Sequence, residues 1–200
     1  EALSGGIGWV VGRAARVPAL LSSFVALAER TGARLAWVPL RAGYRAAIDA
    51  GLLPGLAPFG RTIDEAGAAD LGWGELPERG LDAEQMIEAA AAGELKALVV
   101  GGVDVRDFDD PGAVRAALDE VPFLVSLEVR ASEITDRADV VLPVAPAVEK
   151  NGTFINWEGR LRPFGQARSA TSLTDRDVLV RLTEEFDGDL GITALADPYA

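Results

Sequence analysis

The chain has 200 residues, of which 49% are hydrophobic, and it carries a formal net charge of −12 with no cysteine and no histidine. The apolar fraction is sufficient for a folded core and excludes a disordered chain. The acidic balance argues against nucleic acid as a partner, because a negative surface repels the phosphate backbone. Without cysteine or histidine, these residues cannot supply disulfides, thiolate ligands for zinc or iron–sulfur clusters, or a histidine general base.

The sequence shows no sign of membrane insertion or export. No charge-free apolar run reaches the roughly 18 residues of a membrane-spanning helix, and no polybasic segment is present to bind an anionic membrane. The opening residues, EALSGG, lack both a start methionine and a basic region, so they are not expected to be a signal peptide. We expect the chain to be a fragment of a longer protein.

Five short apolar runs predict β-strands, and most of them are apolar throughout rather than alternating. This pattern is typical of strands that are buried on both faces of a parallel sheet. The runs lie at residues 7–12, 35–40, 97–102, 123–128 and 140–145.

Helical patterns with start and stop signals separate these runs. One helix is predicted to begin at Pro18 and to end before Gly32, and another to follow the N-cap residue Asp82. The predicted helices span residues 18–31, 83–92, 111–120, 132–138 and about 175–186. The alternation of strands and helices predicts a single α/β domain over residues 1–200, with a doubly wound, mainly parallel, Rossmann-like sheet and helices on both faces.

Two segments do not follow this alternation. Residues 51–80 are dense in glycine and proline, which predicts an irregular excursion without a strand in the sheet. Residues 144–164 follow Pro143, where a strand loses a backbone donor, and they predict an extended polar loop.

Glycine motifs raise the question of nucleotide binding. Counted from Gly6, the dinucleotide fingerprint requires a third glycine at the position of Val11, so the fingerprint fails. Gly101 and Gly102 are better placed, because they end a predicted parallel strand where α/β sheets bind ligands. Asp104 could then accept a ribose hydroxyl or a guanine edge, or it could cap the turn locally.

The polar segment from Glu149 to Arg160 is the most informative part of the sequence. Two of its glycines, Gly152 and Gly159, permit close backbone approach or a positive φ angle. The side chains of Asn156 and Glu158 offer hydrogen-bonding groups at short spacing, and a terminal arginine is a bidentate partner for phosphate or carboxylate. We expect that arginine, Arg160, to bind a carboxylate or backbone carbonyls within the folded loop.

Residues 138–160, ADVVLPVAPAVEKNGTFINWEGR, resemble the molybdopterin oxidoreductase family, which shares a pattern close to A-D-V-V-L-P-x-x-x-x-x-E-x-x-G-T-x-x-N-x-E-G-R. The resemblance extends over nearly the whole chain. It implies that the matching positions surround a pterin-guanine dinucleotide in molybdenum-bearing relatives. These positions are Gly101, Gly102, Glu149, Gly152, Thr153, Asn156, Glu158, Gly159 and Arg160. At Arg162 the chain departs from the glutamine that relatives often carry.

Residues 36–58, AWVPLRAGYRAAIDAGLLPGLAP, and residues 156–164, NWEGRLRPF, carry a narrower resemblance, to a molybdenum-free branch of the family found in bacterial NADH-quinone oxidoreductases. It implies a non-catalytic structural domain with no cofactor in this fragment, in which those nine positions are vestigial. It also implies iron–sulfur clusters in a preceding part of the parent, and partners among the subunits of the peripheral arm on the cytoplasmic side of the membrane. The alternatives are half of a pterin site in a formate dehydrogenase-like enzyme, or an unrelated Rossmann-like nucleotide binder.

Overall fold

The structure is a computed structural model that describes residues 7–11, 18–39, 41, 43–63 and 79–186. The chain divides into two compact units. The first unit comprises Glu1–Glu78 and Thr153–Arg162, and the second comprises Arg79–Gly152 and Pro163–Ala200.

The first unit contains a parallel β–α–β arrangement. Strand β1 (Ile7–Val11) pairs in parallel with strand β2 (Arg34–Val38), and helix α2 (Pro18–Thr31) connects them. Gly32 adopts a φ of 67° immediately after the helix, so the predicted glycine stop is confirmed. Both predicted strands and the helix between them are therefore present.

A compact turn structure follows. Helix α3 (Tyr44–Asp49), which the sequence did not predict, leads through Gly51 to the 3-10 turn η1 (Pro58–Gly60). An isolated antiparallel bridge joins Leu56 to Thr62. Within the described residues 51–63 there is no strand of the parallel sheets. Residues 64–78 lie outside the described residues, so the irregular excursion over residues 51–80 stays a prediction.

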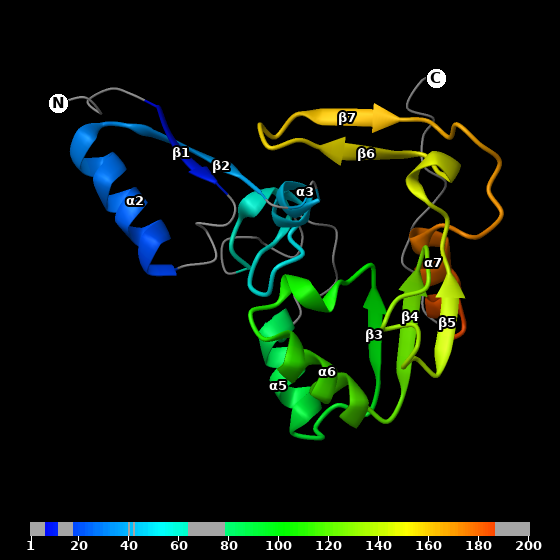
Figure 1. Ribbon diagram of the computed structural model, residues 1–200. Helices are drawn as coiled ribbons and strands as arrows, with labels where there is room; N and C mark the ends of the chain where they lie inside the picture. The colour runs from blue at the N-terminus through cyan, green and yellow to red at the C-terminus, as the bar shows by residue number, and fades with distance from the viewer. Residues whose placement is uncertain (1–6, 12–17, 40, 42, 64–78, 187–200) are drawn as a thin grey trace. The chain divides into compact units, whose positions relative to one another are not determined.

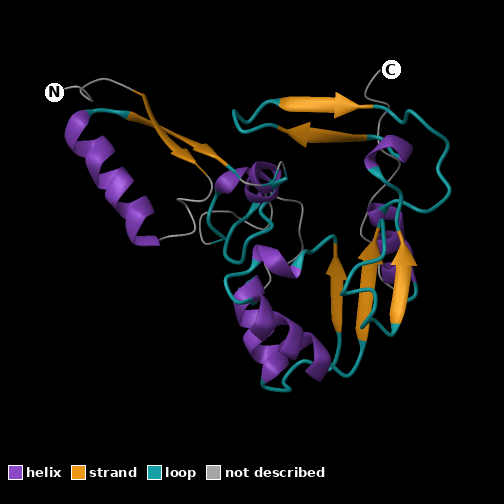
Figure 2. Ribbon diagram, viewed as in Figure 1, coloured by secondary structure: helices purple, strands orange, loops and turns teal. Residues whose placement is uncertain are grey.

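The second unit is built on a three-stranded parallel sheet. Its strands are β3 (Leu98–Gly101), β4 (Leu124–Glu128) and β5 (Val140–Pro143), with β4 in the centre. Its helices are α5 (Ala83–Ala91), α6 (Pro111–Glu120) and α7 (Asp175–Glu184), as Figure 2 shows. Asp82 and Gln85 form the predicted capping box at the start of α5, and Thr174 caps α7.

The core of this unit lies on both faces of β4. On one face Leu124 packs in a buried cluster with Val114 and Leu118 of α6. On the other face Leu127 packs with Val144 and with Val178 of α7. Because successive side chains of a strand point to opposite faces, one strand serves both clusters. The predicted α/β class, with parallel strands and helices on both faces, is confirmed.

The sheet arrangement differs from the prediction in one respect. The five predicted strands are all present, but they pair as β1-β2 and as β3-β4-β5 rather than in one sheet. Apolar strand patterns reveal burial and direction but not which strands become neighbours. That residues 1–200 form a single domain stays a prediction.

The prediction of a helix at residues 132–138 is wrong. Ser132 and Thr135 exchange side-chain to backbone hydrogen bonds, from Ser132 N to Thr135 Oγ1 at 2.8 Å and from Thr135 N to Ser132 Oγ at 3.3 Å. Backbone bonds then close only short turns, from Asp136 N to Ser132 O at 3.1 Å and from Ala138 N to Ile134 O at 3.0 Å, so residues 133–137 form turns rather than a helix. Asp139 then ends the segment by accepting a hydrogen bond from Leu124 N at 2.7 Å.

The extended polar loop expected at residues 144–164 contains regular structure. A short 3-10 turn, η3 (Ala147–Glu149), precedes strands β6 (Gly152–Ile155) and β7 (Leu161–Phe164), which pair with each other. The two strands run side by side in opposite directions (Figure 1). The hairpin was not predicted from the sequence because Gly152 and Pro163 are both unfavourable strand residues.

Gly51→Ala is expected to destabilise the first unit. Gly51 has a φ of 77°, and an added Cβ would lie 2.5 Å from the carbonyl carbon of Ala57. Backbone strain and overlap together should cost about 2–4 kcal/mol. Gly60→Ala is the matched control, because Gly60 has a φ of 69° but nothing within 4 Å of an added Cβ. Urea unfolding should show a clearly smaller effect for Gly60→Ala, and equal effects would contradict the packing argument.

Candidate functional site

The carboxyl end of β3 has the backbone geometry of a ligand-binding turn. Gly101 pairs with Leu127 of β4, and Gly102 N donates to Leu127 O at 3.2 Å. Gly102 then turns with a φ of 61°, and nothing lies within 4 Å of a Cβ built on it. The turn therefore requires a glycine for its conformation, and the space beside that glycine is open.

Asp104 acts as a local cap. Its carboxylate accepts from Arg106 N at 3.0 Å at the start of the 3-10 turn η2 (Val105–Asp107). The same carboxylate pairs with the Arg106 guanidinium at 2.9 and 2.6 Å, which raises the pKa of Arg106. Of the two roles expected for Asp104, the structure shows the capping role.

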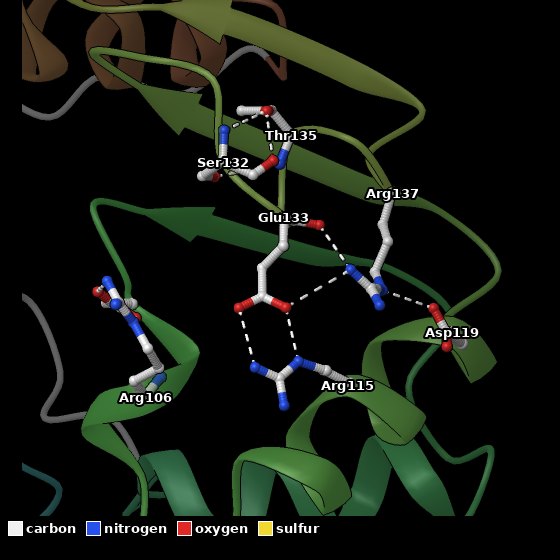
Figure 3. Close-up of polar contacts among 8 residues, drawn as sticks. Arg106, Arg115, Asp119, Ser132, Glu133, Thr135 and Arg137 are labelled. Carbon is white, nitrogen blue, oxygen red and sulfur yellow. Dashed lines mark hydrogen bonds and ion pairs between the residues drawn. The ribbon is translucent and has the colours of Figure 1, made fainter.

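Arginines near this turn form a network with carboxylates rather than an open basic site (Figure 3). Arg115 binds Glu133 through two hydrogen bonds, at 2.6 and 3.2 Å. Arg137 pairs with Asp119 at 2.7 Å and donates to the backbone carbonyl of Glu133 at 2.8 Å. The hydrogen bond from Arg115, and then its charge, hold the pKa of Glu133 below its usual value. These arginines are thus engaged by the protein itself.

Residues 149–151 anchor a later segment of the second unit. Glu149 is buried and accepts hydrogen bonds from the backbone N and the hydroxyl of Thr171, at 3.2 and 3.3 Å. Lys150 forms an ion pair with Asp175. Asn151 Oδ1 accepts from Gln166 N at 2.6 Å. The sequence motif gave no indication of these partners, because they lie 15 or more residues further along the chain.

Close packing at the start of β6 explains why the hairpin has a glycine there. A Cβ on Gly152 would lie 2.7 Å from the ring of Phe164, so the ring packs directly on the glycine backbone. Thr153, the next candidate residue, lies exposed on β6. Gly152 therefore serves the packing of the hairpin.

The hairpin turn is organised around Asn156. Its Oδ1 accepts from Glu158 N at 3.1 Å and Arg160 N at 2.9 Å, and its Nδ2 donates to Glu158 Oε2 at 3.3 Å. Gly159 completes the turn with a φ of 80°, as predicted. Arg160 Nε lies 3.2 Å from Glu158 Oε2, which confirms the expected carboxylate partner. Four of the nine candidate residues thus form one turn whose polar groups bond to one another. They are Asn156, Glu158, Gly159 and Arg160.

A pterin-guanine dinucleotide would need several convergent donors for its diphosphate. The Arg160 side chain is 64% exposed and already paired, and Lys150 is paired with Asp175. Glu149 and Asn156 use their oxygens to hold their own chain. Within the described residues no group of three or more acidic residues could hold a metal ion. The described side chains do not fit as a ready-made dinucleotide site.

The chain belongs to the molybdopterin oxidoreductase family, whose model matches residues 6–174. It is 50% identical to the G subunit of the NADH-quinone oxidoreductase of Streptomyces coelicolor, over 93% of this chain and 24% of that protein. The identity to the G subunit of the Mycobacterium bovis NADH-quinone oxidoreductase is also 50%, over 90% of this chain and 24% of that protein. The chain thus spans about a quarter of the length of these relatives.

A more distant relative carries a different name. The NADPH-Fe(3+) oxidoreductase subunit alpha of Geobacter sulfurreducens is 34% identical over 68% of this chain and 16% of that protein. Across the described part of the chain, no helix has the length and hydrophobicity needed to cross a membrane.

Asn156→Ala is expected to destabilise the chain more than Arg160→Ala. Removing Asn156 leaves two backbone N–H groups without their acceptor, at a cost of about 1–2 kcal/mol. Removing Arg160 breaks one exposed ion pair, for which the cost should stay below about 1 kcal/mol. Urea unfolding of both variants measures the order, and a larger effect for Arg160→Ala would contradict it.

Glu133 is expected to contribute to stability in a pH-dependent way. Its pKa is lowered in the folded state, so its contribution is complete above the unfolded value of about 4.3 and is lost as the pH falls through the folded value. Glu133→Gln should therefore flatten the acid side of the stability curve. Arg115→Gln should flatten it similarly, because Arg115 is the main cause of the shift. Unfolding midpoints measured from about pH 3 to 7 test this, and unchanged curves would contradict it.

Proposed function

We propose that the chain is a non-catalytic structural domain of a bacterial NADH-quinone oxidoreductase, located in the equivalent of the G subunit of its relatives. There it would support the electron transfer from NADH to quinone that the whole complex performs. The observation that carries this proposal is the 50% identity to the Streptomyces G subunit over 93% of the chain. The identity to the Geobacter oxidoreductase subunit is lower and covers less of the chain.

The geometry of the family motif supports a structural role. In Asn156, Glu158 and Arg160, the groups that could recognise a ligand are bonded to one another. Glu149 is buried and holds Thr171 in the same way. For the buried Glu149, this pairing avoids a penalty of about 1–3 kcal/mol for a polar group left unpaired. The nine motif positions are then remnants of a cofactor cradle that now maintain a shape.

The proposal extends to the surroundings of the domain. Its partners would be the other subunits of the peripheral arm, on the cytoplasmic side of the bacterial membrane. Redox cofactors would be iron–sulfur clusters in a preceding part of the parent subunit, since this chain has no cysteine to ligate one. The chain itself would carry no cofactor.

One observation favours a second candidate function, half of a pterin site in a molybdenum-dependent enzyme. Gly102 turns with open space beside it at the carboxyl end of β3, where α/β sheets bind ligands. In addition, a Bacillus subtilis protein whose name marks it as a candidate formate dehydrogenase is 35% identical over 64% of this chain and 14% of its own length. In that case Gly101 and Gly102 would approach the cofactor through their backbone.

Growth on tungstate in place of molybdate separates the two functions. Tungsten enters pterin cofactors instead of molybdenum and impairs their enzymes. We expect the tagged full-length parent to co-purify with other subunits, and its NADH-quinone activity to remain unchanged on tungstate. A nitrate reductase of the same cells serves as the positive control and should lose activity. Loss of the parent's own activity on tungstate, or a stoichiometric molybdenum content, would overturn the structural proposal.

A further inference from the structure

The segment from the end of α3 through η1 displays large apolar side chains to solvent. Phe59 is 85% exposed, Leu52 is 73% exposed and Leu53 is 47% exposed. We call these three residues the 52–59 patch. Single exposed apolar residues are common, but three large ones within eight positions of one short loop are a feature of interaction surfaces.

The loop that carries the patch is rigidly built. The backbone of Gly51 packs directly against the backbone of Ala57, a completely buried residue. Backbone hydrogen bonds close the loop further, from Ala57 N to Arg61 O at 2.8 Å and from Ile63 N to Gly55 O at 3.0 Å. The patch is therefore held in a fixed geometry before any partner arrives, which lowers the entropy lost on binding.

Phe59 itself is held in an unfavourable conformation. Its φ is 69° and its ψ is 23°, and among the described residues it alone has a positive φ without being glycine. This region costs an L-residue roughly 1–2 kcal/mol. Exposure of the ring means that burial within the described chain does not offset this cost. Such strain persists where the surroundings impose it, and it concentrates at functional surfaces.

We propose that the 52–59 patch docks onto a pocket in the rest of the parent polypeptide, with Phe59 as the anchor. This inference rests on the proposed function, in which the chain is part of a longer subunit. The relatives extend over about four times the matched length, since the match covers 24% of them. The surface that receives the patch would thus belong to the same polypeptide chain.

The size of the patch favours such a surface over a separate subunit. Three such side chains supply on the order of 400 Å² of apolar surface, whereas a stable complex of free proteins buries about 800 Å² on each partner. A tethered neighbour acts at an effective concentration in the millimolar range, so a smaller patch is sufficient.

The exposed side chains of the patch indicate the chemistry of the pocket. Because all three are apolar, a complementary pocket would be apolar at its centre. A bilayer would offer no fixed pocket to match a preformed, strained turn, so a protein surface is the better fit.

Photo-cross-linking in the full-length parent tests the proposal. Phe59 is replaced by p-benzoylphenylalanine, the assembled protein is irradiated, and the cross-link is mapped by mass spectrometry. The expected product is one cross-link within the same polypeptide, to a segment outside these 200 residues. Cross-links to another subunit, to lipid, to a second copy or within the 200 residues would each overturn the proposal, as would no cross-link at all.

Two variants test the role of the strained ring. Phe59→Gly removes the ring and relieves the backbone, so the variant should fold at least as well as the natural chain. We nevertheless expect limited proteolysis of the full-length parent to cleave next to this domain about 10-fold faster, because docking is lost. Phe186→Ala is the matched control, since Phe186 is 78% exposed and lies outside the patch. Unchanged cleavage in Phe59→Gly, or equal acceleration in Phe186→Ala, would overturn the proposal.

These outcomes are separate from those of the proposed function. If the parent fails to co-purify with other subunits but the cross-link within the polypeptide forms, the function is wrong and the docking surface stands. If the parent assembles normally and Phe59 forms no cross-link, the docking inference alone fails.

Discussion

The burial of β4 on both faces is the constraint on which the second unit depends. Leu124 on one face and Leu127 on the other belong to two separate buried clusters. Removing either leucine would open a cavity on one face and loosen the helices that cover it. The same strand fixes the candidate site, because Gly102 N is held by the carbonyl of Leu127. Leu127 of β4 therefore has two roles: its side chain packs in the core, and its carbonyl holds the glycine turn in position.

The strands and capped helices could be predicted because their causes are local. Continuous apolar runs required burial, and the Asp82–Gln85 capping box appears in the structure as the sequence indicates. The segment at residues 132–138 was misread, because Ser132 and Thr135 form the reciprocal bonds of a helix start but only turns follow them. Strand neighbours were beyond prediction for a different reason. Pairing depends on the packing of distant segments, and no local pattern encodes it.

The candidate site was likewise only partly predictable from the sequence. Positive φ at Gly159 and a carboxylate partner for Arg160 followed from residue types and spacing. The partners of Glu149, Lys150 and Asn151 did not, because Thr171, Asp175 and Gln166 lie far along the chain.

A family motif can persist for reasons of shape alone. Gly152 lies beneath the ring of Phe164, and Asn156 ties the hairpin turn to two backbone N–H groups. Both requirements would hold with or without a dinucleotide nearby. A match to a cofactor-binding pattern is therefore weak evidence for the cofactor wherever each matched residue has a structural task of its own.

Phe59 presents the opposite case, a residue that the local structure does not require. Phe59 has a φ of 69°, a conformation that glycine adopts freely, so a glycine at position 59 would fit the turn without strain. Phenylalanine instead adds conformational cost and exposes an aromatic ring to water. Such a conflict between a residue and its backbone conformation indicates a requirement outside the described chain. A surface that receives the ring would supply the burial that the turn itself does not.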